Sequence, residues 1–166
     1  MKRRTLLLFI LAALSISCNR DDSIDNEGVL PIEPPQEVKA FFNGHLPSYS
    51  TTGNKSVFNF SEIEYGDSEC FVVNSDEDFK AIVNPETLLP HVDFEKYTLV
   101  VGQHSMSNPG FVLFSQSIID LEDKINLCLT YKSLDGASSD QLAVYYFWGL
   151  YNKLPEKPLS LKINRI

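Results

Sequence analysis

Cysteine is scarce in this chain, and its scarcity limits the kinds of fold and site that the chain can have. Only three of the 166 residues are cysteines, at positions 18, 70 and 128. A disulfide-dense scaffold needs more cysteines in so short a chain, and the regular paired spacing of a structural zinc site is absent. The chain also lacks a nucleophile elbow, a phosphate-binding loop and a dinucleotide fingerprint, so it carries no motif of a common enzyme class.

Basic residues are also in short supply. The chain has 14 lysines and arginines against 22 aspartates and glutamates, a net charge of −8. Three of the basic residues and no acidic one lie in the first 17 positions, so the rest of the chain carries −11. Nucleic acids recruit basic surfaces, so we expect no nucleic acid partner. The carboxylates are scattered along the chain and suggest no acid/base pair.

Long apolar runs are confined to the N-terminus. Lys2, Arg3 and Arg4 precede the apolar segment Thr5–Leu14, which is too short to cross a bilayer as a helix. A basic start, a short apolar run and small residues before a cleavage site are typical of a secretory signal, here residues 1–17. The residues Leu14–Ser17 before Cys18 resemble a bacterial lipobox. The resemblance implies that Cys18 is lipidated and anchors the chain to a membrane without spanning it. The alternative is an ordinary signal peptide with Cys18 as a bystander.

Residues 18–37 have the composition of a flexible tether. Acidic residues come first and Pro31, Pro34 and Pro35 follow, a mixture that buries too little apolar surface to order itself. The stretch Asn19–Asp22 is similar to the export signals of surface lipoproteins of the Bacteroidetes, and Asp22–Ile24 resembles the O-glycosylation acceptor of that group. These resemblances imply an outer-membrane lipoprotein that faces the periplasm or the cell surface. The alternative is a solvated spacer that faces the periplasm.

Residues 38–166 are expected to form a single globular domain. Short segments with period-two alternation or with buried apolar runs predict strands, and turn residues separate them. The clearest is the apolar run that ends the stretch Val92–Gln103. The pattern predicts a β-rich α+β fold, a mostly antiparallel sheet or a small barrel or sandwich of about seven strands with one short helix. Further strands are expected at 38–43, 56–64, 70–73, 111–121, 124–132, 141–151 and 159–164.

The one helix is expected after Ser75. Ser75 can cap the first turn, and the acidic residues Asp76, Glu77 and Asp78 suit the positive end of a helix. Phe79, Ile82 and Val83 then form an inward stripe. The acidic run lacks the alternating ligands and the glycine of a calcium loop, so it is interpreted as a cap.

Cys70 and Cys128 remain once Cys18 is set apart. In an oxidising compartment they can form a disulfide or stay two separate thiols, and the sequence leaves both open. His45, His91 and His104 are interpreted as loop or strand-edge residues. No metal site and no cofactor are expected.

Aromatic residues gather near the end of the chain, at Tyr145, Tyr146, Trp148 and Tyr151. On a strand, Tyr146 and Trp148 point to one face and Tyr145 and Phe147 to the other. One set is expected in the core. The other can be a stacking platform for a sugar or an anchor for a protein, or both sets can pack inside the domain.

A final resemblance concerns residues 70–166. Val92–Phe94 leading into Leu99–Gly102, the loop Asn108–Phe111 and a closing alternating strand resemble the C-terminal domain of the treponemal lipoprotein that stabilises a surface protease complex (PrcB-like). The resemblance implies assembly and not catalysis. We therefore expect a non-enzymatic, lipid-anchored binding or assembly module with a protein partner. One alternative is a surface glycan-binding lipoprotein. Another, a small hydrolase or thiol enzyme, needs a histidine beside Cys70 or Cys128.

Overall fold

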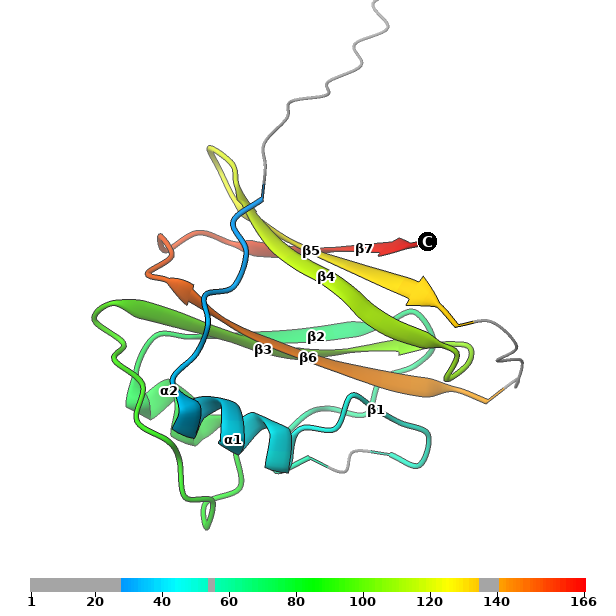
Figure 1. The fold of residues 1–166 in the computed structure, drawn as a ribbon, viewed down its shortest axis with the longest axis horizontal. Coiled ribbons are helices and arrows are strands. Elements are labelled where there is room, and N and C mark those ends of the chain that lie inside the picture. The colour runs from blue at the N-terminus through cyan, green and yellow to red at the C-terminus, as the bar shows by residue number, and fades with distance from the viewer. Residues whose placement is uncertain (1–27, 54–55, 135–140) are drawn as a thin grey trace, which may run out of the picture.

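A computed structural model describes residues 28–53, 56–134 and 141–166, and Figure 1 shows two β-sheets stacked face to face with two helices below one of them. The leader, Cys18 and the first part of the tether lie outside the described residues, as does most of the loop predicted at 133–140. The expectations about lipidation, export and glycosylation therefore stay predictions.

Seven strands build the two sheets. The four-stranded sheet has the order β1-β6-β3-β2 and is antiparallel throughout. The three-stranded sheet has the order β4-β5-β7, with β5 and β7 parallel. The fold class is confirmed: the domain is β-rich and mostly antiparallel. The strands are β1 (Tyr49–Ser50), β2 (Ser68–Val73), β3 (Tyr97–Met106), β4 (Phe111–Asp120), β5 (Ile125–Ser133), β6 (Ala143–Asn152) and β7 (Leu159–Arg165).

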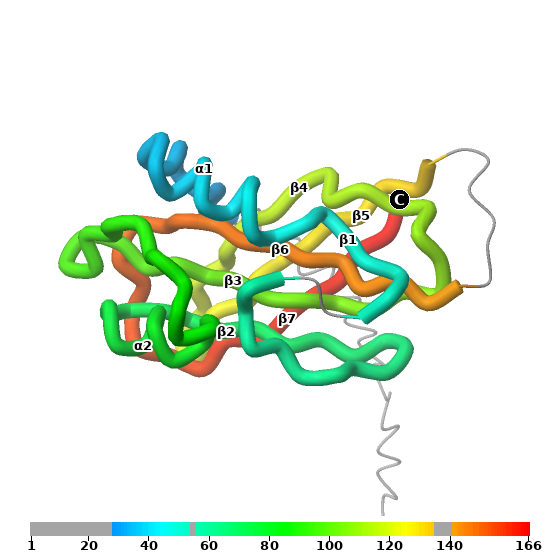
Figure 2. The backbone as a smooth tube through the Cα atoms, turned by 90° about the horizontal axis from the view of Figure 1, so that it is seen from below, coloured from blue at the N-terminus to red at the C-terminus, as the bar shows by residue number. Residues whose placement is uncertain are grey.

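Strand β3 is the centre of the domain. It pairs with β2 on one side and along its whole length with β6 on the other. Every residue from Thr98 to Met106 is buried, because both faces of the sheet are covered. Burial on both faces accounts for the continuous apolar run that predicts this strand, since alternation appears only where one face meets water. Figure 2 shows β3 and β6 running side by side through the middle of the molecule.

Two apolar cores lie on the two faces of the four-stranded sheet. The inner core fills the space between the sheets and includes Val100, Phe147, Leu127 and Tyr131. The outer core packs the opposite face of β3 and β6 against the helices. The alternation predicted for β5 is confirmed, because Ile125, Leu127, Leu129 and Tyr131 all enter the inner core.

Two helices cover the outer core, where the sequence predicts one. Helix α2 (Asp76–Ala81) follows the expected cap: the Ser75 hydroxyl oxygen accepts a hydrogen bond from the Asp78 N–H at 3.1 Å. Helix α1 (Gln36–His45) replaces the strand predicted over residues 38–43, which is therefore wrong. Its buried side chains Val38, Phe41 and Phe42 have the three-and-four spacing of a helix face.

The strand predicted over residues 56–64 is also wrong. The segment makes only an isolated bridge between Phe58 and Val83, and it has no strand among the described residues. Phe58 and Phe60 are buried because they pack across the outer core, with their rings 5.6 Å apart. Their alternation therefore reflects burial against a helix-covered face and not pairing in a sheet.

The folded region begins earlier than predicted. Residues 28–35, assigned from composition to the flexible tether, cross from one sheet to the other at the edge of the sandwich (Figure 1). Val29 and Ile118 of β4 exchange two backbone hydrogen bonds of 2.7 and 2.8 Å, and the Ile32 N–H donates to the Leu150 carbonyl of β6 at 2.8 Å. We call residues 28–35 the strap. Among the described residues no helix is long and apolar enough to cross a membrane.

Candidate functional site

The free edge of β6 contains a gap in its hydrogen bonding. In an antiparallel ladder, every second residue turns its backbone groups away from the strand it is paired with. On β6 these outward residues include Tyr146, whose N–H donates to the Ser48 carbonyl at 3.1 Å, and Leu150, which accepts from Ile32. Trp148 lies between them. Its outward N–H and carbonyl have no hydrogen-bond partner in the described part of the chain.

Two cavities flank Trp148 along this edge. The larger, about 500 Å³, lies between β4 and the turn that joins α1 to β1. The smaller, about 180 Å³, lies under the strap. Trp148 and Asn43 of α1 line both cavities. We call the two together the edge groove.

Among the described residues, no charged side chain lines the larger cavity of the edge groove. Leu46 and Tyr49 line it on one side, and Phe111, Val112 and Leu113 of β4 line the other. Nothing in this wall would repel an apolar ligand, although the chain as a whole is strongly acidic.

The rim of the edge groove exposes apolar side chains from separate parts of the sequence. Val112 and Leu113 of β4 are 40% and 36% exposed, and Tyr49 and Leu134 are nearly half exposed. Phe114, the next residue of β4, is 62% exposed but lines neither cavity. Contiguous exposed apolar surface of this kind is typical of a protein or ligand interface.

Two cations sit at the same end of the domain. Lys132 lies over the Phe114 ring and Arg165 over the Phe111 ring, each 5.9 Å from the ring centroid. Neither cation belongs to an ion pair among the described residues. Phe111 lines the larger cavity, so Arg165 lies close to it, whereas Phe114 and Lys132 line neither cavity.

Trp148 is held rigidly at the edge groove. Its ring stacks on Phe42 with centroids 4.0 Å apart and planes 10° from parallel. It is partly exposed, whereas Tyr145, Tyr146 and Tyr151 are 2%, 4% and 0% exposed. The alternation predicted for these aromatics is confirmed, and both sets pack inside the domain. The three tyrosines therefore cannot form the surface stacking platform, and only Trp148 remains accessible.

Tyr145 closes one end of the larger cavity. Its hydroxyl accepts from the Phe111 N–H at 2.9 Å and donates to the Asn108 carbonyl at 3.1 Å. Burial is the main cause that raises the pKa of this hydroxyl, so it stays protonated and keeps its donor. The hydroxyl thus provides a hydrogen-bond partner for the backbone N–H of Phe111, which would otherwise have none.

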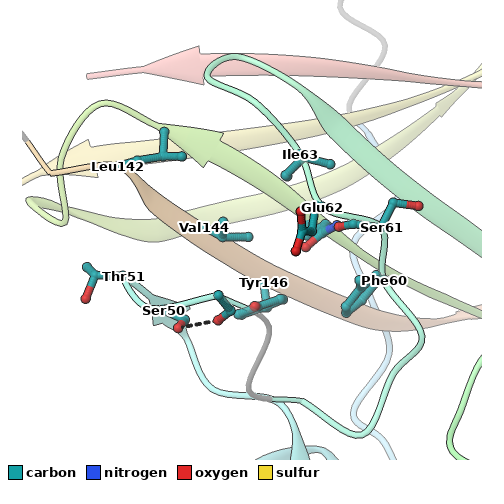
Figure 3. Close-up of a pocket in the computed structure, with 11 residues that line it drawn as sticks. Ser50, Thr51, Phe60, Ser61, Glu62, Ile63, Leu142, Val144 and Tyr146 are labelled. Carbon is teal, nitrogen blue, oxygen red and sulfur yellow. Dashed lines mark hydrogen bonds between the residues drawn. The ribbon is translucent and has the colours of Figure 1, made fainter.

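A second cavity of about 500 Å³ lies on the outer side of the four-stranded sheet. Figure 3 shows Leu142, Val144 and Tyr146 on one side of it and the segment Phe60–Ile63 on the other. Its wall is more polar: Gln103 donates to the Ser61 carbonyl at 2.7 Å and to the Glu69 carboxylate at 2.9 Å. The Gln103 amide is thus already bonded within the domain, and this cavity also differs from the larger one of the edge groove in having a charged side chain, Glu62, in its wall.

Both remaining cysteines are free thiols. Cys70 lies on β2 and Cys128 on β5, in different sheets. The structure thus has the two separate thiols and not the disulfide. Burial raises the pKa of Cys70 to about 12, so this thiol is a poor nucleophile at neutral pH.

Among the described residues, the histidines belong to no group of three or more His, Cys, Asp or Glu side chains that could hold a metal ion. His104 was predicted at a loop or strand edge, which is wrong, because it is 3% exposed within β3. Its Nδ1 lies 2.8 Å from the Ser68 hydroxyl and 3.1 Å from the Asp67 carbonyl. The carbonyl can only accept, so Nδ1 carries the proton and cannot act as a base toward Ser68. Burial lowers the pKa of this imidazole.

No family model, curated protein or solved structure matches the chain. What the fold and the site define is therefore a structural class: a two-sheet, helix-covered β-rich domain with an apolar groove at one open edge.

The sequence indicates Trp148 as a candidate binding residue. It does not indicate that Asn43, Leu113 and the strap belong to the same site. The run Phe111–Phe114 is apolar without alternation, which is the one sequence signal that could have pointed to an exposed apolar edge.

Proposed function

We propose that this protein is a non-enzymatic, lipid-anchored binding or assembly module at the bacterial outer membrane, and that it holds a protein partner in the edge groove. The observation that carries the proposal is the exposed apolar rim of β4 next to a cavity with uncharged walls and Trp148 on its surface. Tryptophan and other aromatic residues at a partly desolvated position are the usual anchors of protein interfaces. The resemblance to the treponemal assembly lipoprotein supports the same role.

The anchor is proposed from the leader and Cys18. The strap holds the N-terminal side of the fold at the edge groove, so a tether that starts at Cys18 would place the groove close to its point of attachment. Palmitate labelling of the wild-type chain and its loss in the Cys18→Ala variant would support this part. Equal labelling of both would contradict it.

The binding role is tested by crosslinking in intact cells followed by recovery of the full-length protein. The Leu113→Glu variant places a charge on the rim of the groove and should lose the crosslinked partner. The matched control is Leu88→Glu, whose side chain is 91% exposed and lies outside the groove. Both variants must keep the wild-type urea midpoint. A partner that is recovered equally with both variants would contradict the placement of the site.

A further inference from the structure

We propose that the partner binds the edge groove as a short extended segment, which pairs its backbone with Trp148 and places an apolar side chain in the larger cavity. This inference rests on the proposed function, because it names the kind of partner that the same groove takes. The occupant is thus an extended loop or terminus of another protein, and not a folded surface or a sugar.

The first step is the open position on β6. Ser48 bonds to Tyr146 at one end and Ile32 bonds to Leu150 at the other, so the chain itself already pairs with the edge on both sides of Trp148. The four-residue span between these bonds is about 13 Å long at the rise of a strand. Three to five residues of an extended segment fill such a span and bring one N–H and one carbonyl opposite Trp148.

The second step is the side-chain environment. A residue that pairs with a strand points its side chain to alternate faces, so a segment on β6 directs one side chain toward β4. There it meets Phe111 and Leu113 in a cavity that no charged side chain of the described ranges lines. The cavity therefore selects an apolar side chain. Asn43 lines both cavities beside Trp148 and provides an amide that can bond to a backbone carbonyl or N–H.

The third step is charge. Arg165 lies over the ring of Phe111, which lines the larger cavity, and Lys132 lies over the Phe114 ring of the same strand. Neither cation has an ion-pair partner among the described residues. An acidic residue next to the apolar one would meet Arg165 beside the cavity. The preferred segment is thus extended, apolar at its centre and acidic at one end.

The open backbone position is testable in the free protein by amide hydrogen exchange. Phe147 and Gly149 turn their N–H groups toward β3, whereas the Trp148 N–H points into the groove. We expect the Trp148 amide to exchange at least about tenfold faster than those of its two neighbours. Equal protection of the three amides would overturn the inference.

The binding mode is tested with a displayed library of random ten-residue peptides, selected on the mature protein with Cys18→Ser. We expect selected peptides with a central apolar residue. Their affinity should fall about tenfold when the amide that pairs with Trp148 is N-methylated, and N-methylation at the neighbouring amides should have less effect. They should also protect the Trp148 amide, bind the Leu88→Glu variant and fail to bind Leu113→Glu.

Two results would overturn the inference. One is a library that yields no peptide dependent on Leu113, and the other is binding that N-methylation at every position leaves unchanged. If the crosslinked partner in cells still depends on Leu113 in either case, the proposed function stands and only the extended binding mode fails. If that partner is also absent, the proposed function fails with it.

Discussion

At the scale of single residues, two glycines have opposite surroundings and make a matched pair. A Cβ on Gly102 of β3 would lie 2.4 Å from the Glu69 carbonyl and 2.4 Å from the Phe147 ring. Gly44 in α1 has nothing within 4 Å. Gly102→Ala should therefore destabilise the domain by about 1–3 kcal/mol or more, because backbone has to move. Gly44→Ala should be neutral or stabilise by up to about 1 kcal/mol. Urea denaturation of both variants measures the two changes in the free energy of unfolding. A Gly102→Ala variant as stable as the wild type would contradict the close packing around Gly102.

Cys70 gives a prediction about pH at the same scale. Its pKa is raised from 9.0 to about 12 by burial, so the unfolded chain loses this proton at lower pH than the folded chain. The stability contributed by the neutral thiol is complete below pH 9 and falls between pH 9 and 12, by at most ~1.4 kcal/mol per pH unit. The Cys70→Ala variant should show a smaller loss between pH 8 and 10 in urea denaturation under reducing conditions.

The control for this prediction is Cys128→Ala. Burial also raises the pKa of Cys128, but the nearby Lys162 lowers it, so this variant should keep most of the pH-dependent loss. Buried Tyr131 and Tyr151 also have raised pKa values and extend the loss above about pH 10. A Cys70→Ala variant with the full wild-type loss would show that the thiol is not the group responsible.

At the scale of elements, the cap of α2 is the most local feature. The Ser75 hydroxyl satisfies the Asp78 N–H, and Phe79 one residue later is buried against α1. Ser75→Ala should cost about 1 kcal/mol of stability, because one N–H of the first turn loses its partner. Ser75→Asp keeps an acceptor and should cost much less. Thermal unfolding followed by circular dichroism separates the two, and equal losses would argue against the cap.

The elements differ in how well their sequences predict them. Ser75 and Val92–Gln103 predict the cap and the central strand correctly, because capping chemistry and a run buried on both faces are local signals. The sequence of α1 predicts a strand, because the apolar residues Val38, Phe41 and Phe42 also favour strands and the pair Asn43-Gly44 favours a turn. The three-and-four spacing of these side chains is also compatible with a helix. Whether the segment forms a helix or a strand depends on the sheet face that it covers, which the local sequence does not show.

At the scale of the whole molecule, the strap is expected to contribute to stability. Its backbone bonds join β4 to β6, and Pro31 packs close to Gly149. Replacing Val29 and Ile32 together with glycine keeps the chain length and removes apolar side chains from the edge. We expect a lower urea midpoint, by about 1–3 kcal/mol in the free energy of unfolding. Leu30→Gly, at a side chain 64% exposed, is the control and should change little. Equal urea midpoints for the wild type, the double variant and Leu30→Gly would mean that the strap does not stabilise the domain.

The edge groove belongs to this scale too, which is why the sequence did not predict it. The sequence indicates that Trp148 lies on a strand among aromatic residues. It does not indicate that β1 begins only at Tyr49, that the strap pairs two residues further along β6, or that α1 lies alongside. The groove exists because three segments that are remote in sequence leave one position of a strand uncovered.

The strap also determines how the domain responds to force. A load applied through the N-terminal side of the chain reaches the two bonds between Val29 and Ile118 before it reaches the bond from Ile32 to Leu150. Such a load would act on these bonds in succession, and its first effect would be to peel the strap from β4 and then from β6. Peeling removes one wall of the smaller cavity beside Trp148. Loss of the strap would therefore widen the edge groove beside Trp148.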